Sequence, residues 1–171
     1  MNNKKALIAI ITVFSFTLIF YLSHFFLSKD FSKAACAKLK AADREIFLEL
    51  ARTRQEQTLG LMFRRSLAAD RGMFFVFNSS DKRTFWMKNT MLPLDILFID
   101  SSLRVKRIFS GVPVPFDNEN EETIPRVSAE AKYVLEIASG TAASLGIKEG
   151  DGLNLKAVDR ESCPEFNISR R

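Results

Sequence analysis

Residues 85–100 (FWMKNTMLPLDILFID) contain many polar and charged side chains between segments that otherwise have the pattern of plain strands. An isolated charge beside so many aromatic residues is costly to bury. We therefore expect these side chains to converge on a ligand, together with charged residues from two other segments. The predicted ligand-binding residues are Arg64, Lys88, Asn89, Thr90, Asp95 and Glu136. Such a pocket would bind a small anionic or polar molecule, with Lys88 and Arg64 as hydrogen-bond donors.

The same residues have a purely structural interpretation, which stays open. In that interpretation Lys88 pairs with Asp95 or Glu136, and the cluster only fixes the register of the strands. Asn89 and Thr90 would then satisfy backbone groups at a turn.

Methionine forms a second group of interest. All methionines other than the initiator lie within one window of 30 residues: Met62, Met73, Met87 and Met91. Thioethers are soft ligands that select Cu(I). Copper handling is therefore an alternative function, although methionine is also a common apolar filler in protein cores. No other metal site and no cofactor are predicted.

The chain has one histidine, His24, and it lies inside an apolar segment near the N-terminus. The rest of the chain therefore lacks Ser-His-Asp and Cys-His nucleophile arrangements and imidazole metal sites. A histidine-independent hydrolase remains an alternative, with Lys88 and Ser66 as a dyad or with Asp95 and Glu136 as a carboxylate pair. Because ordinary strands contain the same residue types, we expect binding rather than catalysis.

Residues 6–28 carry no Asp, Glu, Lys or Arg. At about 1.5 Å per residue, a helix of this length could cross a hydrocarbon layer about 30 Å thick. Residues 1–28 are therefore predicted to be a signal anchor, with Lys4 and Lys5 on the cytoplasmic side and the domain outside the cytoplasm, either periplasmic or extracellular. Ala35-Cys36-Ala37 resembles a signal-peptidase site, so secretion after cleavage is the alternative.

The composition predicts one globular domain with an appendage, since the chain has 171 residues, of which 47% are hydrophobic. The net charge of +5 is a small excess and forms no basic stripe, so nucleic acid is not an expected partner. The expected partners are the membrane and a small ligand or an envelope protein. Cys36 and Cys163 could form a disulfide in an oxidising compartment or remain unpaired.

The hydrophobic pattern predicts an α+β fold that is mostly β: a small barrel-like or strongly curved antiparallel sheet with two short helices. Thr53 and Glu56 have the spacing of a capping box, which predicts a helix with Leu59, Met62, Phe63 and Leu67 on its apolar side. The expected divisions are a stalk at 29–44 that can form helix, a globular domain at 45–158 and a tail at 159–171. Strands are expected at 46–51, 73–77, 94–100, 103–109, 131–140 and 153–158, a helical turn at 141–145, and a solvated loop at 110–128.

Several motifs occur in order along the domain: GLMFR at 60–64, GMFFVF at 72–77, FWMKNT at 85–90, PLDILFID at 93–100, YVLEI and a glycine at 133–140, and GIKEGD at 146–151. Together they resemble the bacterial and archaeal family known as domain of unknown function 192, over residues 45–158. The resemblance implies a compact, mostly β domain that is often exported and has no established activity. It supplies no catalytic residue.

Overall fold

The computed structural model describes residue 31 and residues 33–116 and 120–166 of the chain. The chain divides into two compact units, residues 1–33 and residues 34–171. In the part that is described, no helix combines the length and the apolar character needed to span a membrane. The predicted anchor at 6–28 lies outside the described residues.

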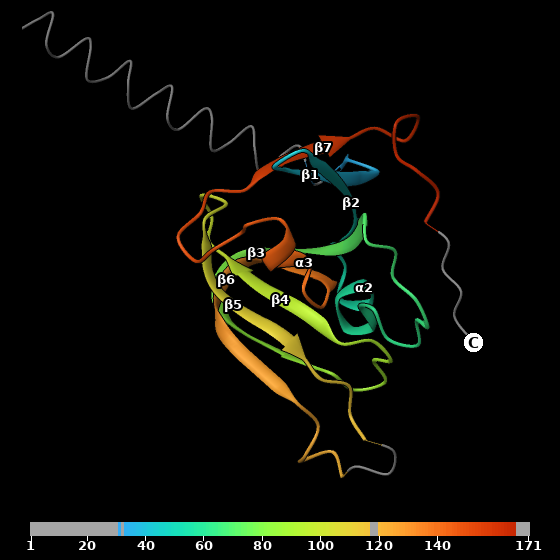
Figure 1. The fold of residues 1–171 in the computed structure, drawn as a ribbon, viewed down its shortest axis with the longest axis vertical. Helices are drawn as coiled ribbons and strands as arrows, with labels where there is room; N and C mark the ends of the chain where they lie inside the picture. Colours follow the sequence, from blue (N-terminus) through green and yellow to red (C-terminus); the bar gives the residue numbers. More distant parts are fainter. Residues whose placement is uncertain (1–30, 32, 117–119, 167–171) are drawn as a thin grey trace, which may run out of the picture. The chain divides into compact units, whose positions relative to one another are not determined.

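The described part of residues 34–171 folds around a seven-stranded sheet with the strand order β5-β4-β6-β3-β2-β1-β7 (Figure 1). Two short helices accompany it, so the prediction of a mostly β fold with two short helices is confirmed. The elements are β1 (Cys36–Ala41), β2 (Arg44–Ala51), α2 (Arg54–Leu59), β3 (Arg71–Trp86), β4 (Leu94–Ile99), β5 (Val105–Val112), β6 (Arg126–Ala138), α3 (Thr141–Ser144) and β7 (Asn154–Val158).

The sheet is mixed and open, which corrects two details of the predicted barrel-like antiparallel sheet. β2 and β3 run parallel, with Phe47 opposite Arg71 and Ala51 opposite Phe75. β5 and β7 are the edge strands, and an isolated antiparallel bridge joins Arg104, just before β5, to Gly152, shortly before β7. A parallel pair needs a crossover connection, and here α2 and the segment after it provide one.

Strand β1 lies in the segment that was expected to be a stalk. It pairs with β2 on one side and with β7 on the other. Ala37 and Leu39 are fully buried, while Lys40 is exposed. Alanine contributes little to a hydrophobic pattern, which explains why this strand escaped prediction. Cys36 at the start of β1 forms a disulfide with Cys163, so the bridging alternative is the one that the structure contains.

The capping box at the start of α2 is confirmed. The Thr53 hydroxyl accepts a hydrogen bond from the Glu56 amide at 3.2 Å, and the Glu56 carboxylate accepts one from the Thr53 amide at 2.8 Å. The helix is shorter than expected, because Gly60 ends it with a φ of +45°. The apolar side predicted to continue beyond residue 59 is therefore not helical, and Phe63 is 42% exposed.

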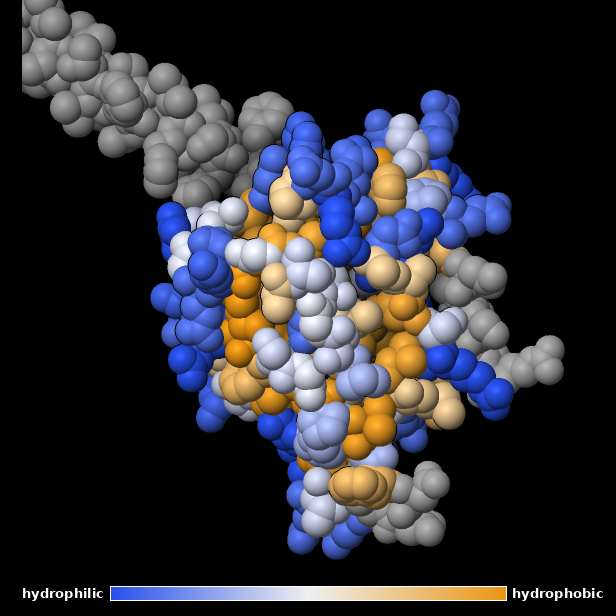
Figure 2. All heavy atoms as spheres, viewed as in Figure 1, coloured by the Kyte–Doolittle hydropathy of each residue, from blue (hydrophilic) through white to orange (hydrophobic). Residues whose placement is uncertain are grey.

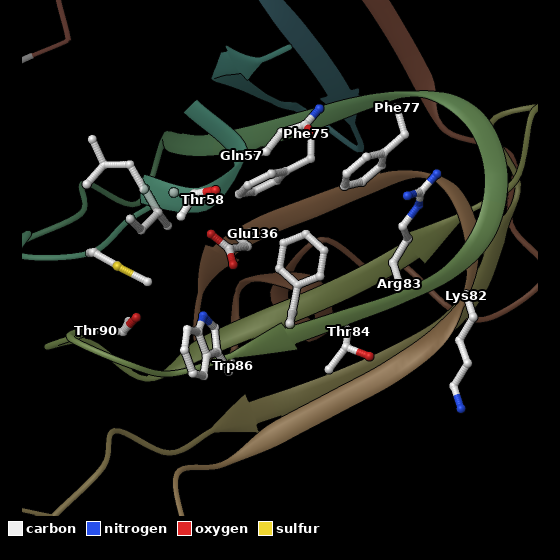
Figure 3. Close-up of a pocket in the computed structure, with 15 residues that line it drawn as sticks. Gln57, Thr58, Phe75, Phe77, Lys82, Arg83, Thr84, Trp86, Thr90 and Glu136 are labelled. Atoms are coloured by element: carbon white, nitrogen blue, oxygen red, sulfur yellow. The ribbon is translucent and has the colours of Figure 1, made fainter. Parts of the chain in front are cut away.

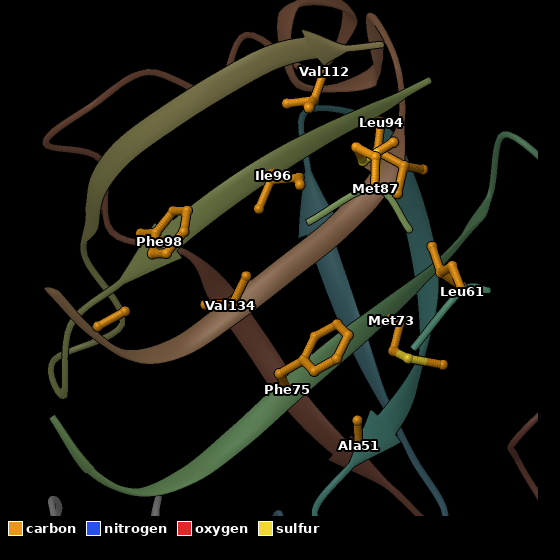
Figure 4. Close-up of a cluster of buried hydrophobic side chains, with 11 residues drawn as sticks. Ala51, Leu61, Met73, Phe75, Met87, Leu94, Ile96, Phe98, Val112 and Val134 are labelled. Atoms are coloured by element: carbon orange, nitrogen blue, oxygen red, sulfur yellow. The ribbon is translucent and has the colours of Figure 1, made fainter. Parts of the chain in front are cut away.

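Strand β3 continues beyond residue 77, where the expected strand ends. Its pairing with β6 shifts between Val76 and Asp81, and the strand bends there instead of ending. As a result the second half of β3 curls back over the first, and the Phe85 ring lies 4.8 Å from the Phe75 ring, centroid to centroid. Figure 4 shows that buried side chains such as Phe75, Val134 and Phe98 come from neighbouring strands of the curved sheet.

The surface viewed in Figure 2 has apolar side chains at several separate places, interspersed with charged ones. Among the described residues, the large hydrophobic side chains that are most exposed are Phe63, Met91, Val114 and Phe116. Exposed apolar side chains are usual on protein surfaces.

Candidate functional site

A cavity of about 450 Å³ lies between α2 and the bent strand β3 (Figure 3). Its aromatic walls come from both halves of β3 and consist of Phe75, Phe77, Phe85 and Trp86. Residues 57–62, from α2 and the turn after it, form the opposite wall, and Glu136 of β6 lies between the two walls. The volume is within the range of about 300 to 1,000 Å³ that is typical of small-molecule sites.

Backbone geometry holds the two walls in place. The bend of β3 directs its second half back towards Phe75 and Phe77, and the rings of Phe77 and Phe85 pack edge to face. Gln57 of α2 donates a side-chain hydrogen bond to the Val76 carbonyl at 2.9 Å, which joins the helix to β3 just before the bend. The cavity is therefore part of the folded structure and does not depend on an unattached loop.

Glu136 is the most unusual residue of the cavity. It is 6% exposed, and its Oε2 atom has no hydrogen-bond partner among the described residues. Burial raises the pKa of this carboxyl to about 8, although the positive charge of Arg64 acts in the opposite direction. At pH 7 the side chain is therefore mostly an uncharged acid, which can donate one hydrogen bond and accept others.

Arg64 is buried and already has an acidic partner. Its Nη2 atom lies 2.7 Å from Oε2 of Glu49, and its Nη1 atom contacts the other carboxylate oxygen. Met73 of β3 is paired with Glu49 of β2 on one side and with Glu136 of β6 on the other. Both acids therefore lie on the same face of the sheet. Sequence analysis missed Glu49, although an acid inside the apolar strand 46–51 is the same signal that identified Glu136.

Arg83 lies at the margin of the cavity, near the bend of β3 (Figure 3). Its guanidinium carbon is 4.1 Å from the centroid of the Phe77 ring, and its Nη2 atom donates to the Ser79 carbonyl at 2.7 Å. Burial and the positive charge of Arg83 both lower the pKa of Lys132. Arg83 is not among the ligand-binding residues predicted from the sequence, and it lies outside the strands expected there.

Asp95, one of the predicted ligand-binding residues, lies on the other face of the sheet. It is opposite Ile137 on β6, whereas Glu136 is opposite Ile96. The fully buried Asp95 carboxylate accepts hydrogen bonds from the amides of Gly111 and Ala142, each at 2.9 Å. It therefore fixes the start of α3, and the structure does not assemble Asp95 and Glu136 into a carboxylate pair.

The three predicted residues at 88–90 lie in different environments. Lys88 forms an ion pair with Glu121 at 3.3 Å, rather than with Asp95 or Glu136. Asn89 has a φ of +54°, and its carbonyl accepts a hydrogen bond from the Phe63 amide. Thr90 is 7% exposed and lines the cavity.

The structure thus brings two of the predicted ligand-binding residues, Thr90 and Glu136, to one cavity. Arg64 lies on a separate cavity of about 310 Å³ together with Ser66, the proposed dyad partner of Lys88. Lys88 is not among the residues that line either of these two cavities.

The four methionines considered for copper have different environments. Met73 and Met87 are buried in the main core, Met62 lines the cavity, and Met91 is 51% exposed. Within the described residues, no group of three or more His, Cys, Asp or Glu side chains could hold a metal ion.

Comparison with known proteins matches residues 37–155 to the family profile of DUF192, which is described as "Uncharacterized ACR". A crystal structure from Sinorhizobium meliloti, provisionally described as a transcription regulator, is 35% identical, with 70% of this chain and 91% of that chain covered and a TM-score of 0.59. A protein of unknown function from Novosphingobium aromaticivorans is 40% identical, with 70% and 83% covered and a TM-score of 0.58. No curated protein matches the chain.

Proposed function

Since the chain belongs to the DUF192 family, which is defined without an assigned activity, we propose a function from the site itself. The chain is a small-ligand-binding module that works outside the cytoplasm, and its binding site is the cavity between α2 and β3. The ligand has an apolar body that packs between the aromatic walls and a polar atom that hydrogen-bonds to Glu136.

The observation that carries this proposal is the buried Glu136 carboxyl without a partner for Oε2. Buried polar atoms in folded proteins nearly always have hydrogen-bond partners, and an exception needs an explanation. A carboxyl whose pKa is raised by burial, inside a cavity, is also a typical feature of functional sites. A ligand that accepts a hydrogen bond from the acid form would satisfy this group.

The proposed location outside the cytoplasm rests on two features of the chain. Residues 6–28 have the length and composition of a membrane anchor. Cys36 and Cys163 form a disulfide, a bond that persists mainly in oxidising compartments. Membrane attachment through residues 6–28 would keep the binding domain at the membrane surface.

The binding test can use residues 34–171. This unit contains the whole described sheet, the main cluster of buried hydrophobic side chains and the disulfide. The crystallised Sinorhizobium relative matches 70% of this chain over 91% of its own length, so a chain of about this extent folds by itself. Trp86 is the only tryptophan of the protein and lines the cavity, so its fluorescence reports directly on binding.

The experiment titrates residues 34–171 with a library of small aromatic and alkyl metabolites and measures Trp86 fluorescence. We expect at least one compound to bind with 1:1 stoichiometry. Thr58 lines the cavity from α2, whereas Gln55 on the same helix does not. Binding should therefore be lost in Thr58→Phe and retained in the matched control Gln55→Phe. Binding that both variants retain equally would show that the cavity is not the site.

A further inference from the structure

We propose that the cavity selects organic anions, which are molecules with an apolar or aromatic body and one negatively charged head group that Arg83 binds at the cavity margin. This inference rests on the proposed function, because it concerns the same cavity and specifies the charge of its ligand.

The charged residues that line the cavity are Lys82, Arg83 and Glu136. Two of them are cations, and the carboxyl of Glu136, with a pKa of about 8, is mostly uncharged at pH 7. Burial lowers the pKa of Lys132, and the positive charge of Arg83 lowers it further. An anion entering the cavity would therefore meet a favourable potential.

Aromatic walls can also bind cations, but here the protein's own cations lie against the rings. Arg83 lies over Phe77, and the Lys88 ammonium and the Arg126 guanidinium carbon lie 4.7 Å and 5.6 Å from the centroid of the Trp86 ring. A cationic ligand would be repelled by these groups. It would also need Glu136 to ionise in a buried position, which costs free energy.

Arg83 retains donors for an anion. Among the described residues it forms no ion pair, its Nη2 atom donates to the Ser79 carbonyl, and its Nε atom has no partner. The nearby acids have other neighbours: Asp81 accepts from the Lys82 amide, and Glu130 is opposite Lys82 on the adjacent strand. A carboxylate or sulfonate could accept charge-assisted hydrogen bonds from the Arg83 guanidinium.

The positions of the polar groups define how such a ligand would lie. Arg83 is at the bend of β3, whereas Glu136 is nearer to Thr58 and α2, and the aromatic rings lie between them (Figure 3). The anionic head would contact Arg83, the apolar body would pack against Phe75 and Phe85, and the far end would meet the Glu136 acid.

The test uses two dyes with the same aromatic body. 8-Anilinonaphthalene-1-sulfonate is an anion, and N-phenyl-1-naphthylamine is its neutral counterpart. Energy transfer from Trp86 to each dye is measured at pH 7 with residues 34–171. We expect Arg83→Gln to weaken binding of the sulfonate about tenfold, the effect of losing a charge-assisted hydrogen bond, and to change binding of the neutral dye less than about twofold. The exposed Arg65 provides the matched control, and Arg65→Gln should change neither.

Arg83→Lys retains the charge and should recover part of the sulfonate binding, which separates loss of charge from loss of fold. Two results would overturn the inference of an anionic ligand. In the first, Arg83→Gln leaves binding of the sulfonate unchanged. In the second, Arg83→Gln weakens binding of both dyes equally while its thermal unfolding is the same as that of the wild type. The proposed function survives either result when Thr58→Phe still abolishes energy transfer to the neutral dye, because the cavity then remains the binding site. If neither dye shows energy transfer that Thr58→Phe abolishes, both proposals are overturned.

Discussion

Replacing Glu136 with glutamine should change how the stability of the protein depends on pH. Glutamine has nearly the same shape as glutamic acid but does not titrate, so the variant removes the proton equilibrium and little else. The folded-state pKa of Glu136 is about 8, compared with 4.5 for an unperturbed glutamate. At about 1.4 kcal/mol for each pH unit, this difference corresponds to about 5 kcal/mol between the two protonation states.

The direction follows from counting protons. Between pH 4.5 and about pH 8, the unfolded chain has lost the Glu136 proton while the folded protein retains it. The folded state therefore binds more protons, and the free energy of unfolding falls as pH rises through this window. This contribution is fully present below pH 4.5 and absent above about pH 8. Between about pH 5 and about pH 7.5 the wild type should lose about 3 kcal/mol that Glu136→Gln does not lose.

Urea unfolding of residues 34–171 at the two pH values, followed by Trp86 fluorescence and by far-UV circular dichroism, measures this difference. Other titrating groups affect the wild type and the variant equally, so they cancel in the comparison. Glu130 lies on the same strand but is exposed, and Glu130→Gln serves as the matched control. We expect its stability to depend on pH in the same way as that of the wild type. If the stability gap between Glu136→Gln and the wild type differs by less than about 1 kcal/mol between the two pH values, the carboxyl is not held in its acid form.

Other predictions concern the scaffold. Gly72→Ala should destabilise the domain by about 1 to 3 kcal/mol, because a Cβ there would lie 2.7 Å from the Glu136 carbonyl oxygen; chemical denaturation tests this, and an unchanged midpoint would contradict it. Reducing the disulfide between Cys36 and Cys163 should lower the free energy of unfolding by about 2 to 5 kcal/mol. Urea unfolding with and without dithiothreitol measures this, and equal midpoints would show that the bridge contributes nothing to stability. Thr53→Ala should lower the free energy of unfolding by about 1 kcal/mol, because it removes the cap of α2. Thr53→Ser keeps a hydroxyl at this position and should retain most of that stability.

Local signals in the sequence predicted local structure well. The Thr53 and Glu56 pair predicted the capping box, because both partners lie within one turn of the chain. The strands expected at 94–100 and 103–109 correspond to β4 and β5, which pair antiparallel. Glu136 was selected because an isolated charge beside aromatic residues is costly to bury. In the structure, burial raises the pKa of this carboxyl.

Features that depend on distant parts of the chain were not predicted. The parallel pairing of β2 with β3 is set by the crossover through α2, which no local pattern encodes. β1 is a strand because β2 and β7 pair with it on both sides, although its own sequence is rich in alanine and lysine. The sheet face on which Asp95 lies also follows from register, and a shift of one residue would have placed it with Glu136.

The bend of β3 and the cavity are one structural feature, and this explains why sequence analysis found part of the site and missed the rest. In a straight strand, the ten steps from Phe75 to Phe85 would span about 33 Å at about 3.3 Å per residue, whereas the two rings lie 4.8 Å apart. The polar residues between the two halves have the pattern of a turn, because a strand that curls back on itself needs the same residue types. Arg83 therefore reaches the cavity only through the bend, while Glu136 reaches it from the middle of β6. A cation and an uncharged acid that are far apart in sequence thus face one aromatic cavity, a combination that suits a ligand with a negative head and an apolar body.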